Sequence, residues 1–338
     1  MMKRIGIGWL TAAACFFLGA CRTPDSYRIT RADSRVMKKE ADRFLHALPA
    51  GLQQRQTAAI RKAIEGDPAA LNAVRHSRNA VPDAVENVKT RMLAPTLRLY
   101  EPAGNDGPLP LLIYLHGGGW TFGSLNSCAR FCQAVAASGR MKVLAVDYRL
   151  APENPFPAGL DDCRHAVLYA HSHAGLLGID ENRIAVGGDS SGGNLALATA
   201  LSPVCRDRIE SLVLFYPVTK AFDDGSDSWR KYGTGYGLDA QIMCAFDSAY
   251  VADGSPYDAQ ISVALCSDSV LSRLPRTLLI AAGRDILRDQ GKELARRVGK
   301  RMTRIEFRNA VHLFITVAGQ ERAFGKAVDF TVRFIGRP

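Results

Sequence analysis

The segment that most constrains the fold of this chain is residues 188–193, which read Gly-Asp-Ser-Ser-Gly-Gly. A short apolar stretch at 182–187 precedes it and strong helix formers at 194–201 follow it, so the pattern predicts a strand, a tight turn and a helix in direct succession. Glycines at such a turn leave room for an unusual serine backbone conformation that lifts the hydroxyl out of the sheet. Ser190 is therefore the candidate nucleophile. Ser191 is a weaker alternative, because only Ser190 has a glycine two residues away on each side.

A second glycine-rich segment, residues 116–120, reads His-Gly-Gly-Gly-Trp and follows an apolar stretch at 111–115 that we expect to be a buried strand. Three successive glycines suit either a flexible loop or a backbone whose amides approach a substrate oxygen more closely than a Cβ would allow. A third segment, residues 147–158, begins Asp-Tyr-Arg-Leu-Ala-Pro-Glu. We interpret its oppositely charged Arg149 and Glu153 as bracing the site rather than touching substrate.

Together these segments resemble the hormone-sensitive-lipase-like branch of the α/β-hydrolase esterases, whose marks are H-G-G-G-[WF], D-Y-R-L-A-P-E-x-x-F-P-A and G-D-S-[SA]-G-G. The resemblance implies the α/β-hydrolase fold, in which a mostly parallel central sheet carries helices on both faces and a helical cap. It also implies an oxyanion hole formed by the amides of Gly118, Gly119 and Ser191. Loss of one such donor typically lowers the rate on the order of a hundredfold to a thousandfold.

The resemblance further implies a histidine base that comes after the nucleophile in the chain. His312 is the only histidine after Ser190, and it follows an alternating strand pattern at 304–307. Leu313 comes next, where the family commonly has glycine, and we expect it to change loop packing or to narrow the pocket without removing a catalytic atom.

The catalytic acid is expected after the apolar strand at 276–282, and two aspartates follow that strand. Asp285 stands at the end of the strand and fits the pattern G-x-x-D-x-L-x-D-x-G of the family. Asp289 falls in the first turn of the next helix, where a carboxylate suits the helix dipole. We therefore prefer Asp285 and keep Asp289 as the alternative.

The reaction implied is acyl transfer from an ester to Ser190, with His312 as the base, Asp285 fixing its tautomer, and water releasing the acid. We predict a serine carboxylesterase that needs no cofactor and acts on short-chain, acetyl-like esters. An amidase would use the same triad. From a different class, a catalytically silent hydrolase fold could serve as an envelope binding or scaffold lipoprotein.

The start of the chain resembles a bacterial lipoprotein leader. Lys3 and Arg4 are followed by an uncharged stretch at 5–20 that ends Leu-Gly-Ala, directly before Cys21. The pattern predicts cleavage after residue 20, lipidation of Cys21, and a membrane-anchored enzyme of the cell envelope, by family analogy at the outer membrane. A transmembrane helix and a plain secretory leader are the alternatives.

The expected domains are the leader at 1–20, a helical cap segment at 21–90, and a hydrolase domain at 91–338 with a cap insertion at 219–270. The insertion is too long for an ordinary loop inside a domain. Aromatic residues near the site or within the insertion are candidates to line the substrate pocket, although each could equally be ordinary packing: Trp120, Phe122, Tyr232 and Tyr236.

Six of the eight cysteines would remain unmodified in the exported chain, namely Cys128, Cys132, Cys163, Cys205, Cys244 and Cys266. Their pairing cannot be read from spacing, and we predict a Cys244–Cys266 disulfide within the insertion. The helices that carry Cys128 and Cys163 are expected on opposite faces of the sheet, which argues against cross-linking them.

The composition of the chain excludes few classes of binding partner. The formal net charge of +10 falls to +8 without the leader, and because the basic residues are spread along the chain they favour a solvated basic surface. No nucleic-acid motif is present.

Three histidines at 165, 171 and 173 do not suit a metal site, because residues 171 and 173 point apart on a helix. The oligomeric state stays open, with a homodimer as the general expectation.

Overall fold

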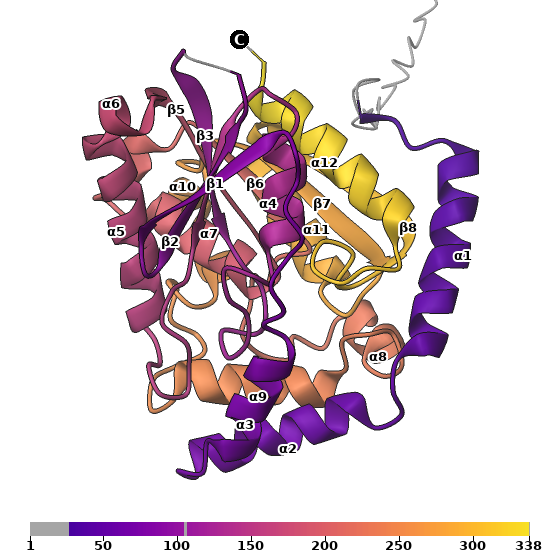
Figure 1. Ribbon diagram of the computed structural model, residues 1–338. Coiled ribbons are helices and arrows are strands. Elements are labelled where there is room, and N and C mark those ends of the chain that lie inside the picture. The colour runs from indigo at the N-terminus through magenta and orange to yellow at the C-terminus, as the bar shows by residue number, and fades with distance from the viewer. Residues whose placement is uncertain (1–26, 105–106, 338) are drawn as a thin grey trace, which may run out of the picture.

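The computed structural model describes residues 27–104 and 107–337, and the predicted leader and Cys21 lie outside the described residues. Its centre is one sheet with the strand order β1-β2-β4-β3-β5-β6-β7-β8 (Figure 1). β2 pairs antiparallel with β1 and β4, and all other neighbours are parallel, which confirms the predicted mostly parallel sheet. The strands are β1 (Val88–Ala94), β2 (Leu97–Pro102), β3 (Leu109–Leu115), β4 (Lys142–Val146), β5 (Ile179–Asp189), β6 (Ser211–Phe215), β7 (Arg276–Arg284) and β8 (Met302–Val311).

Helices cover both faces of the sheet, because successive side chains of each strand point to opposite faces. In β3, Leu112 and Tyr114 pack in the apolar cluster of α4 and α12, whereas Leu111 and Ile113 pack in the cluster of α5 and α7. Each fully buried aliphatic side chain contributes roughly 1.5–3 kcal/mol. The larger helices are α1 (Arg31–Ala47), α2 (Leu52–Ile64), α3 (Ala69–Ser77), α4 (Ala129–Ala136), α5 (Ala158–Ser172), α7 (Ser191–Leu201), α9 (Ala240–Val251), α11 (Arg288–Val298) and α12 (Glu321–Ile335).

The carboxyl ends of the parallel strands meet at one edge of the sheet, which faces α9 in Figure 1. β5 ends at Asp189, β7 at Arg284 and β8 at Val311. The residues that follow these ends are Ser190, Asp285 and His312, so the topology alone gathers all three predicted catalytic residues at the same edge.

The N-terminal stretch differs from the helical segment expected through residue 90. Helices end at Ser77, and β1 begins at Val88 as the edge strand of the sheet. The helical prediction fails there because most of β1 is exposed, so its sequence carries no strict apolar alternation. α1 also lies along β8 and α12, at the right of Figure 1, instead of covering the site over its whole length.

The insertion after β6 is helical rather than loop-like, with the short helices α8 (Asp227–Tyr232) and α10 (Asp268–Leu271) on either side of α9. α9 packs against α2 below the carboxyl edge of the sheet, and these helices form the cap together with α3 (Figure 1). None of the helices in the described part of the chain has the length and apolar character required to cross a bilayer.

The predicted disulfide between Cys244 and Cys266 is wrong, because both residues carry free thiols. Cys244 is exposed on α9, whereas Cys266 follows a 3₁₀ turn and its thiol donates to the Ala259 carbonyl. Cys128 and Cys163 belong to the apolar clusters on opposite faces of the sheet, as expected. The insertion is therefore held by packing and not by a cross-link.

Candidate active site

Ser190 occupies the turn between β5 and α7 in a strained conformation, with φ 53° and ψ −118°. Such a backbone costs on the order of 1–3 kcal/mol and persists only where the surroundings enforce it. The Ser190 amide donates to the Phe215 carbonyl at 2.9 Å. Gly188 and Gly192 lie so close to the Leu115 carbonyl that a Cβ at either position would collide with it. The two glycines thus let the turn press against the end of β3 and hold the serine in place.

Ser190, His312 and Asp285 form one hydrogen-bonded chain. The Ser190 hydroxyl lies 3.1 Å from His312 Nε2, and His312 Nδ1 lies 2.6 Å from Asp285 Oδ2. Asp285 Oδ1 accepts a further bond from the Leu287 amide at 2.9 Å. Because the buried carboxylate accepts from Nδ1, the imidazole keeps Nε2 free to accept the serine proton.

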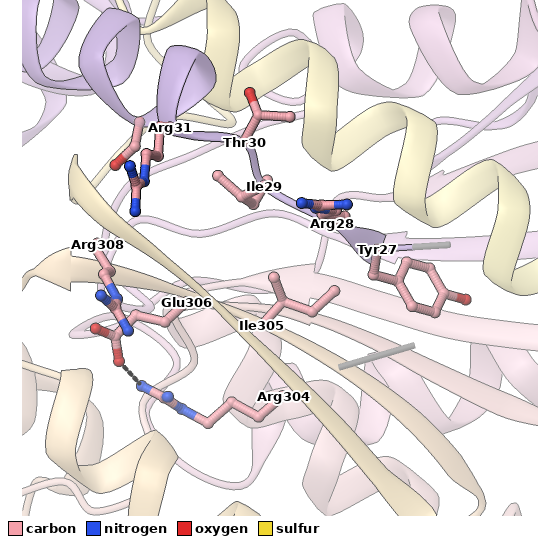
Figure 2. Close-up of a pocket in the computed structure, with 10 residues that line it drawn as sticks. Tyr27, Arg28, Ile29, Thr30, Arg31, Arg304, Ile305, Glu306 and Arg308 are labelled. Carbon is pink, nitrogen blue, oxygen red and sulfur yellow. Dashed lines mark hydrogen bonds and ion pairs between the residues drawn. The ribbon is translucent and has the colours of Figure 1, made fainter. Parts of the chain in front are cut away.

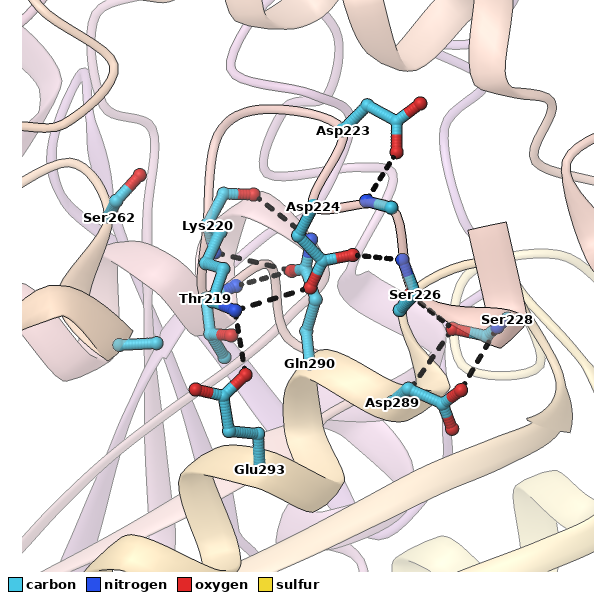
Figure 3. Close-up of polar contacts among 12 residues, drawn as sticks. Thr219, Lys220, Asp223, Asp224, Ser226, Ser228, Ser262, Asp289, Gln290 and Glu293 are labelled. Carbon is cyan, nitrogen blue, oxygen red and sulfur yellow. Dashed lines mark hydrogen bonds and ion pairs between the residues drawn. The ribbon is translucent and has the colours of Figure 1, made fainter. Parts of the chain in front are cut away.

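Asp289, the alternative acid, has other partners and stays away from the imidazole. It lies in the first turn of α11, accepts from the Ser228 amide at 2.9 Å and pairs with Arg288 at 2.7 Å. Figure 3 shows this carboxylate beside Ser228, at the end of the polar network that joins α11 to the start of the insertion. The Arg288 guanidinium lowers the pKa of Asp289. Asp289 therefore ties α8 to α11.

The glycines after His116 are required by packing as well as by access to a substrate. Gly118 and Gly119 both have positive φ, 128° and 60°. A Cβ on Gly119 would overlap the Phe246 ring of α9, and one on Gly118 would meet the Phe122 carbonyl. No acceptor within residues 27–104 and 107–337 takes a hydrogen bond from the amides of Gly118, Gly119 or Ser191. These three amides are thus available to a developing oxyanion.

Asp189 fixes this glycine loop to the nucleophile turn. Its carboxylate is buried and accepts from the Gly117 amide and from the Tyr114 hydroxyl, each at 2.9 Å. Burial raises the pKa of Asp189, and the two donors oppose that shift. The residue is part of the first motif of the sequence, but the motif alone gave no partner for it, because Gly117 lies 72 positions earlier.

A cavity of about 130 Å³ opens directly onto Ser190 and His312. Its apolar wall comes from α1 and its C-cap, from α2, and from α9 with the segment before it: Phe44, Leu48, Leu52, Leu238, Ile242 and Phe246. A larger groove of about 710 Å³ lies elsewhere, between Tyr27–Arg31 and β8 (Figure 2). That groove contains none of the predicted catalytic residues, so the smaller cavity is the candidate active site.

Of the four aromatic residues predicted to line the pocket, only Phe122 does so. Trp120 is buried and stacks on Tyr250 with ring centroids 4.3 Å apart. Tyr232 and Tyr236 pack edge to face on each other with ring centroids 4.9 Å apart, and neither lines the cavity. The sequence predicted that the N-terminal helical segment covers the site, but it did not identify the individual wall residues on α1 and α2, because nothing local shows which residues of a helix meet a distant loop.

Leu313 has a φ of 70°, in the left-handed region that favours glycine. Its side chain lines the cavity next to His312. The predicted narrowing of the pocket by this residue therefore agrees with its position, and the chain accepts about 1 kcal/mol of backbone strain to place a leucine there.

The charged residues of the third motif do brace the loops around the site, each through a different partner. Arg149 forms a fork with Asp162, the shortest contact being 2.8 Å. Glu153 accepts two bonds from Arg75, at 2.7 and 2.9 Å. Arg75 also donates to the carbonyls of Thr121 and Ala151, each at 2.8 Å, and so fastens α3 to the glycine loop.

No group of three or more His, Cys, Asp or Glu side chains in the described ranges is arranged to hold a metal ion. His173 stacks on Tyr169 at 4.3 Å instead of facing the other two histidines of its cluster as a ligand set.

Comparison with known proteins agrees with this geometry. A family model described as alpha/beta hydrolase fold matches residues 112–316. The chain is 36% identical over 220 residues to carboxylic ester hydrolase LipN of Mycobacterium tuberculosis, covering 62% of this chain and 57% of that protein. It is 38% identical over 206 residues to ethyl acetate hydrolase of Pseudomonas putida, covering 59% and 64%. The matched region thus spans less than two thirds of the length of either relative.

Among solved structures, carboxyl esterase 2 of the fungus Tuber melanosporum superposes with a TM-score of 0.69 at 27% identity, covering 76% of this chain and 88% of that one. This structural match covers more of the chain than either of these two sequence matches does.

Proposed function

Since this chain belongs to the α/β-hydrolase family, we propose that it is a serine carboxylesterase. The observation that carries the proposal is the hydrogen-bonded chain from Ser190 through His312 to Asp285, beside three amides with no internal acceptor. Relatives named as carboxylic ester and ethyl acetate hydrolases support the ester as substrate class.

In the proposed mechanism, His312 Nε2 takes the proton of Ser190 as its oxygen attacks the ester carbonyl. The amides of Gly118, Gly119 and Ser191 stabilise the tetrahedral oxyanion. His312 then protonates the leaving alcohol, and a water molecule activated by the same imidazole releases the acid from the acyl-enzyme. Asp285 stays ionised throughout and stabilises the imidazolium.

The size of the cavity supports a short acyl group. The cavity directly at Ser190 has a volume of about 130 Å³, which corresponds to about four water molecules at roughly 30 Å³ each and fits an acetyl to butyryl chain. Its wall is apolar except at the reacting groups, at two glutamines and at Arg78, and a longer acyl chain would have to extend past Phe122 and Leu313 into the neighbouring cavity of about 320 Å³.

We also propose a lipid anchor on Cys21, which would hold the enzyme at the cell envelope. The support is the pattern of Lys3 and Arg4, an uncharged stretch and Leu-Gly-Ala before the cysteine. Mass spectrometry of the protein purified from membranes should find an acylated Cys21 as the first residue, and Cys21→Ser should lose the lipid. A Cys21→Ser protein that is still processed and still carries lipid would refute the anchor.

The test of the esterase is hydrolysis of 4-nitrophenyl esters from acetate to decanoate by the purified full-length chain, beside Ser190→Ala. We expect turnover to peak at acetate to butyrate, and Ser190→Ala to lower kcat by a factor on the order of 10³ to 10⁶. Turnover that survives in Ser190→Ala, or a folded wild-type protein inactive on every ester, would contradict the proposal.

A further inference from the structure

Arg78 places a positive charge at the junction of two cavities. It ends α3, where its amide donates to the Val74 carbonyl, and its guanidinium carbon lies 5.1 Å from the centre of the Phe122 ring. Arg78 lines the cavity that holds Ser190 and His312, and also a neighbouring cavity of about 320 Å³. Phe122 borders both, so the guanidinium stacked on it faces the space where these cavities join.

No carboxylate neutralises this charge. None of the described residues that line the two cavities is Asp or Glu, and no ion pair to Arg78 occurs in the described part of the chain. Arg75, one turn earlier on the same helix, differs in this respect. Its guanidinium donates hydrogen bonds to Glu153 and to two backbone carbonyls. Although solvent reaches the Arg78 side chain, partial burial of its head lowers the pKa of Arg78, and no acidic group offsets that effect.

A partly desolvated guanidinium without a partner gains more from an anion than a fully hydrated one does. Its planar fork matches a carboxylate, and such charge-assisted bonds are about twice as strong as neutral ones. The other residues that line both cavities are Gly118, Phe122, Leu313 and Val317. Among the described residues Arg78 is the one charged side chain of this lining, because the polar side chains elsewhere in the two walls are neutral: Gln53, Gln56, Ser127 and Thr316.

We propose that Arg78 selects short esters that carry a carboxylate, either on the acyl part or on the alcohol part. The inference rests on the proposed esterase function and narrows its substrate class. Arg78 acts as a specificity residue, because it would bind the charged end of the substrate and takes no proton from the reacting atoms.

Two matched substrate pairs test the proposal. On the alcohol side, 4-acetoxybenzoate is compared with 4-isopropylphenyl acetate. On the acyl side, mono-4-nitrophenyl glutarate is compared with 4-nitrophenyl 5-methylhexanoate, with rates corrected for spontaneous hydrolysis. In each pair an isopropyl group replaces the carboxylate at nearly constant shape, so the ratio of kcat/KM isolates the charge.

In the wild-type protein we expect at least one pair to favour the anionic ester. Arg78→Gln should reduce kcat/KM for that ester by roughly 10- to 100-fold and change the neutral one by less than about threefold. Arg78→Lys keeps the charge and should retain part of the preference. Arg61→Gln is the matched control, because Arg61 is an exposed arginine of α2 that lines neither cavity, and it should leave both rates unchanged.

Equal losses on both members of a pair in Arg78→Gln, or a wild-type preference for the neutral ester in both pairs, would overturn the inference while leaving the esterase proposal intact. A wild-type protein inactive on all four esters would instead refute the esterase. Calorimetry with 4-hydroxybenzoate for the alcohol side and glutarate for the acyl side gives a readout without turnover: Ser190→Ala should bind at least one of the two at least tenfold more tightly than Ser190→Ala/Arg78→Gln. Equal binding of both ligands by the two proteins also overturns the inference.

Discussion

Two buried aspartates, one at the nucleophile turn and one in the cap, differ in whether their carboxylates have hydrogen-bond donors. Asp189 is 1% exposed and has two hydrogen-bond donors, Tyr114 and Gly117. Asp247, in the middle of α9, is 7% exposed, and neither of its oxygens has a partner among the described residues. Burial raises the pKa of both, and for Asp247 it is the only cause.

The difference shows which part of the molecule is organised in advance for chemistry. At the strand ends, polar side chains are bonded to the loops whose positions matter, so Asp189 and Asp285 each hold a neighbour in place. The cap is held by packing of α9 on α2, by the Arg75 clamp and by the contact of Asp289 with Ser228. A buried carboxyl without donors stabilises nothing there, and it costs free energy whenever it ionises.

The pH dependence of stability follows from Asp247. Its pKa in the folded state lies well above the ordinary value of 3.8, so the folded protein holds a proton that the unfolded chain releases between these two values. The stability contributed by the neutral carboxyl is complete below about pH 3.8 and is lost as pH rises toward the folded-state pKa. At neutral pH the buried Asp247 carboxyl therefore carries a cost that no donor reduces among the described residues, whereas the Tyr114 and Gly117 donors reduce the corresponding cost at Asp189.

The largest expected effect tests the hydrogen-bonded carboxylates at the strand ends. Asp285→Asn should lower kcat on 4-nitrophenyl acetate by about 10⁴-fold, because an amide no longer fixes the productive tautomer of His312. Asp289→Asn, which alters the contact between α8 and α11 and the ion pair with Arg288, should stay within a few-fold of wild type. If the two variants exchanged these results, Asp289 would be the acid and the assignment would be reversed.

Asp189→Ala should lower kcat by about 100-fold, because the Gly117 amide loses its acceptor and the oxyanion amides next to it lose their fixed position. Asp189→Asn keeps an oxygen for both donors and should lose less than tenfold. Steady-state kinetics together with melting curves separate this effect from unfolding. An alanine variant that melts normally and retains full kcat would show that the bonded aspartate has no role in positioning.

Arg75→Gln should destabilise the protein by about 2 kcal/mol, since it removes a two-bond ion pair and two bonds to buried-loop carbonyls. Urea unfolding measures the change. Lys38→Gln is the control, because it breaks an exposed ion pair with Asp42 that should contribute less than about 0.5 kcal/mol. Equal effects from the two variants would mean that α3 is not fastened through Arg75.

The smallest expected effect tests the buried Asp247 carboxyl of the cap, which has no hydrogen-bond partner among the described residues. Asp247→Asn removes the ionisable group at nearly constant shape and should raise stability by about 1 kcal/mol at pH 8, with no gain at pH 4. Thermal melts across this pH range check it, and the expected rise in Tm at pH 8 is about 2 °C. Destabilisation at pH 8 would show that the carboxylate has a partner and would remove the contrast with Asp189.

The site residues that could be predicted from the sequence are those fixed by local backbone conformation or by chain order. The Ser190 turn and the glycine loop were predictable because each needs glycine at defined positions within six residues. His312 was predictable from chain order and from being the only histidine after Ser190. Asp285 could be preferred but not chosen outright, because both aspartates fit the pattern, and the hydrogen bond to His312 was needed to separate them.

The features that escaped prediction depend on contacts between distant parts of the chain. Arg75 meets Glu153 across 78 positions, and Trp120 turns toward Tyr250 of the insertion instead of the cavity. β1 was missed because a mostly exposed edge strand needs no apolar alternation. Cys244 and Cys266 share one insertion, but their separate helical turns point the two thiols at different surroundings.

Leu313 bears on how such an enzyme could diverge. Most substitutions that change specificity reduce stability, which limits how many a lineage can accumulate. At Leu313 the backbone already has a conformation that glycine adopts without strain, while the side chain borders both cavities beside His312. Replacing this leucine with glycine would relieve about 1 kcal/mol of strain as it enlarges the pocket. The acceptance of longer acyl groups can therefore evolve in a single step, with a smaller loss of stability than elsewhere in the pocket wall.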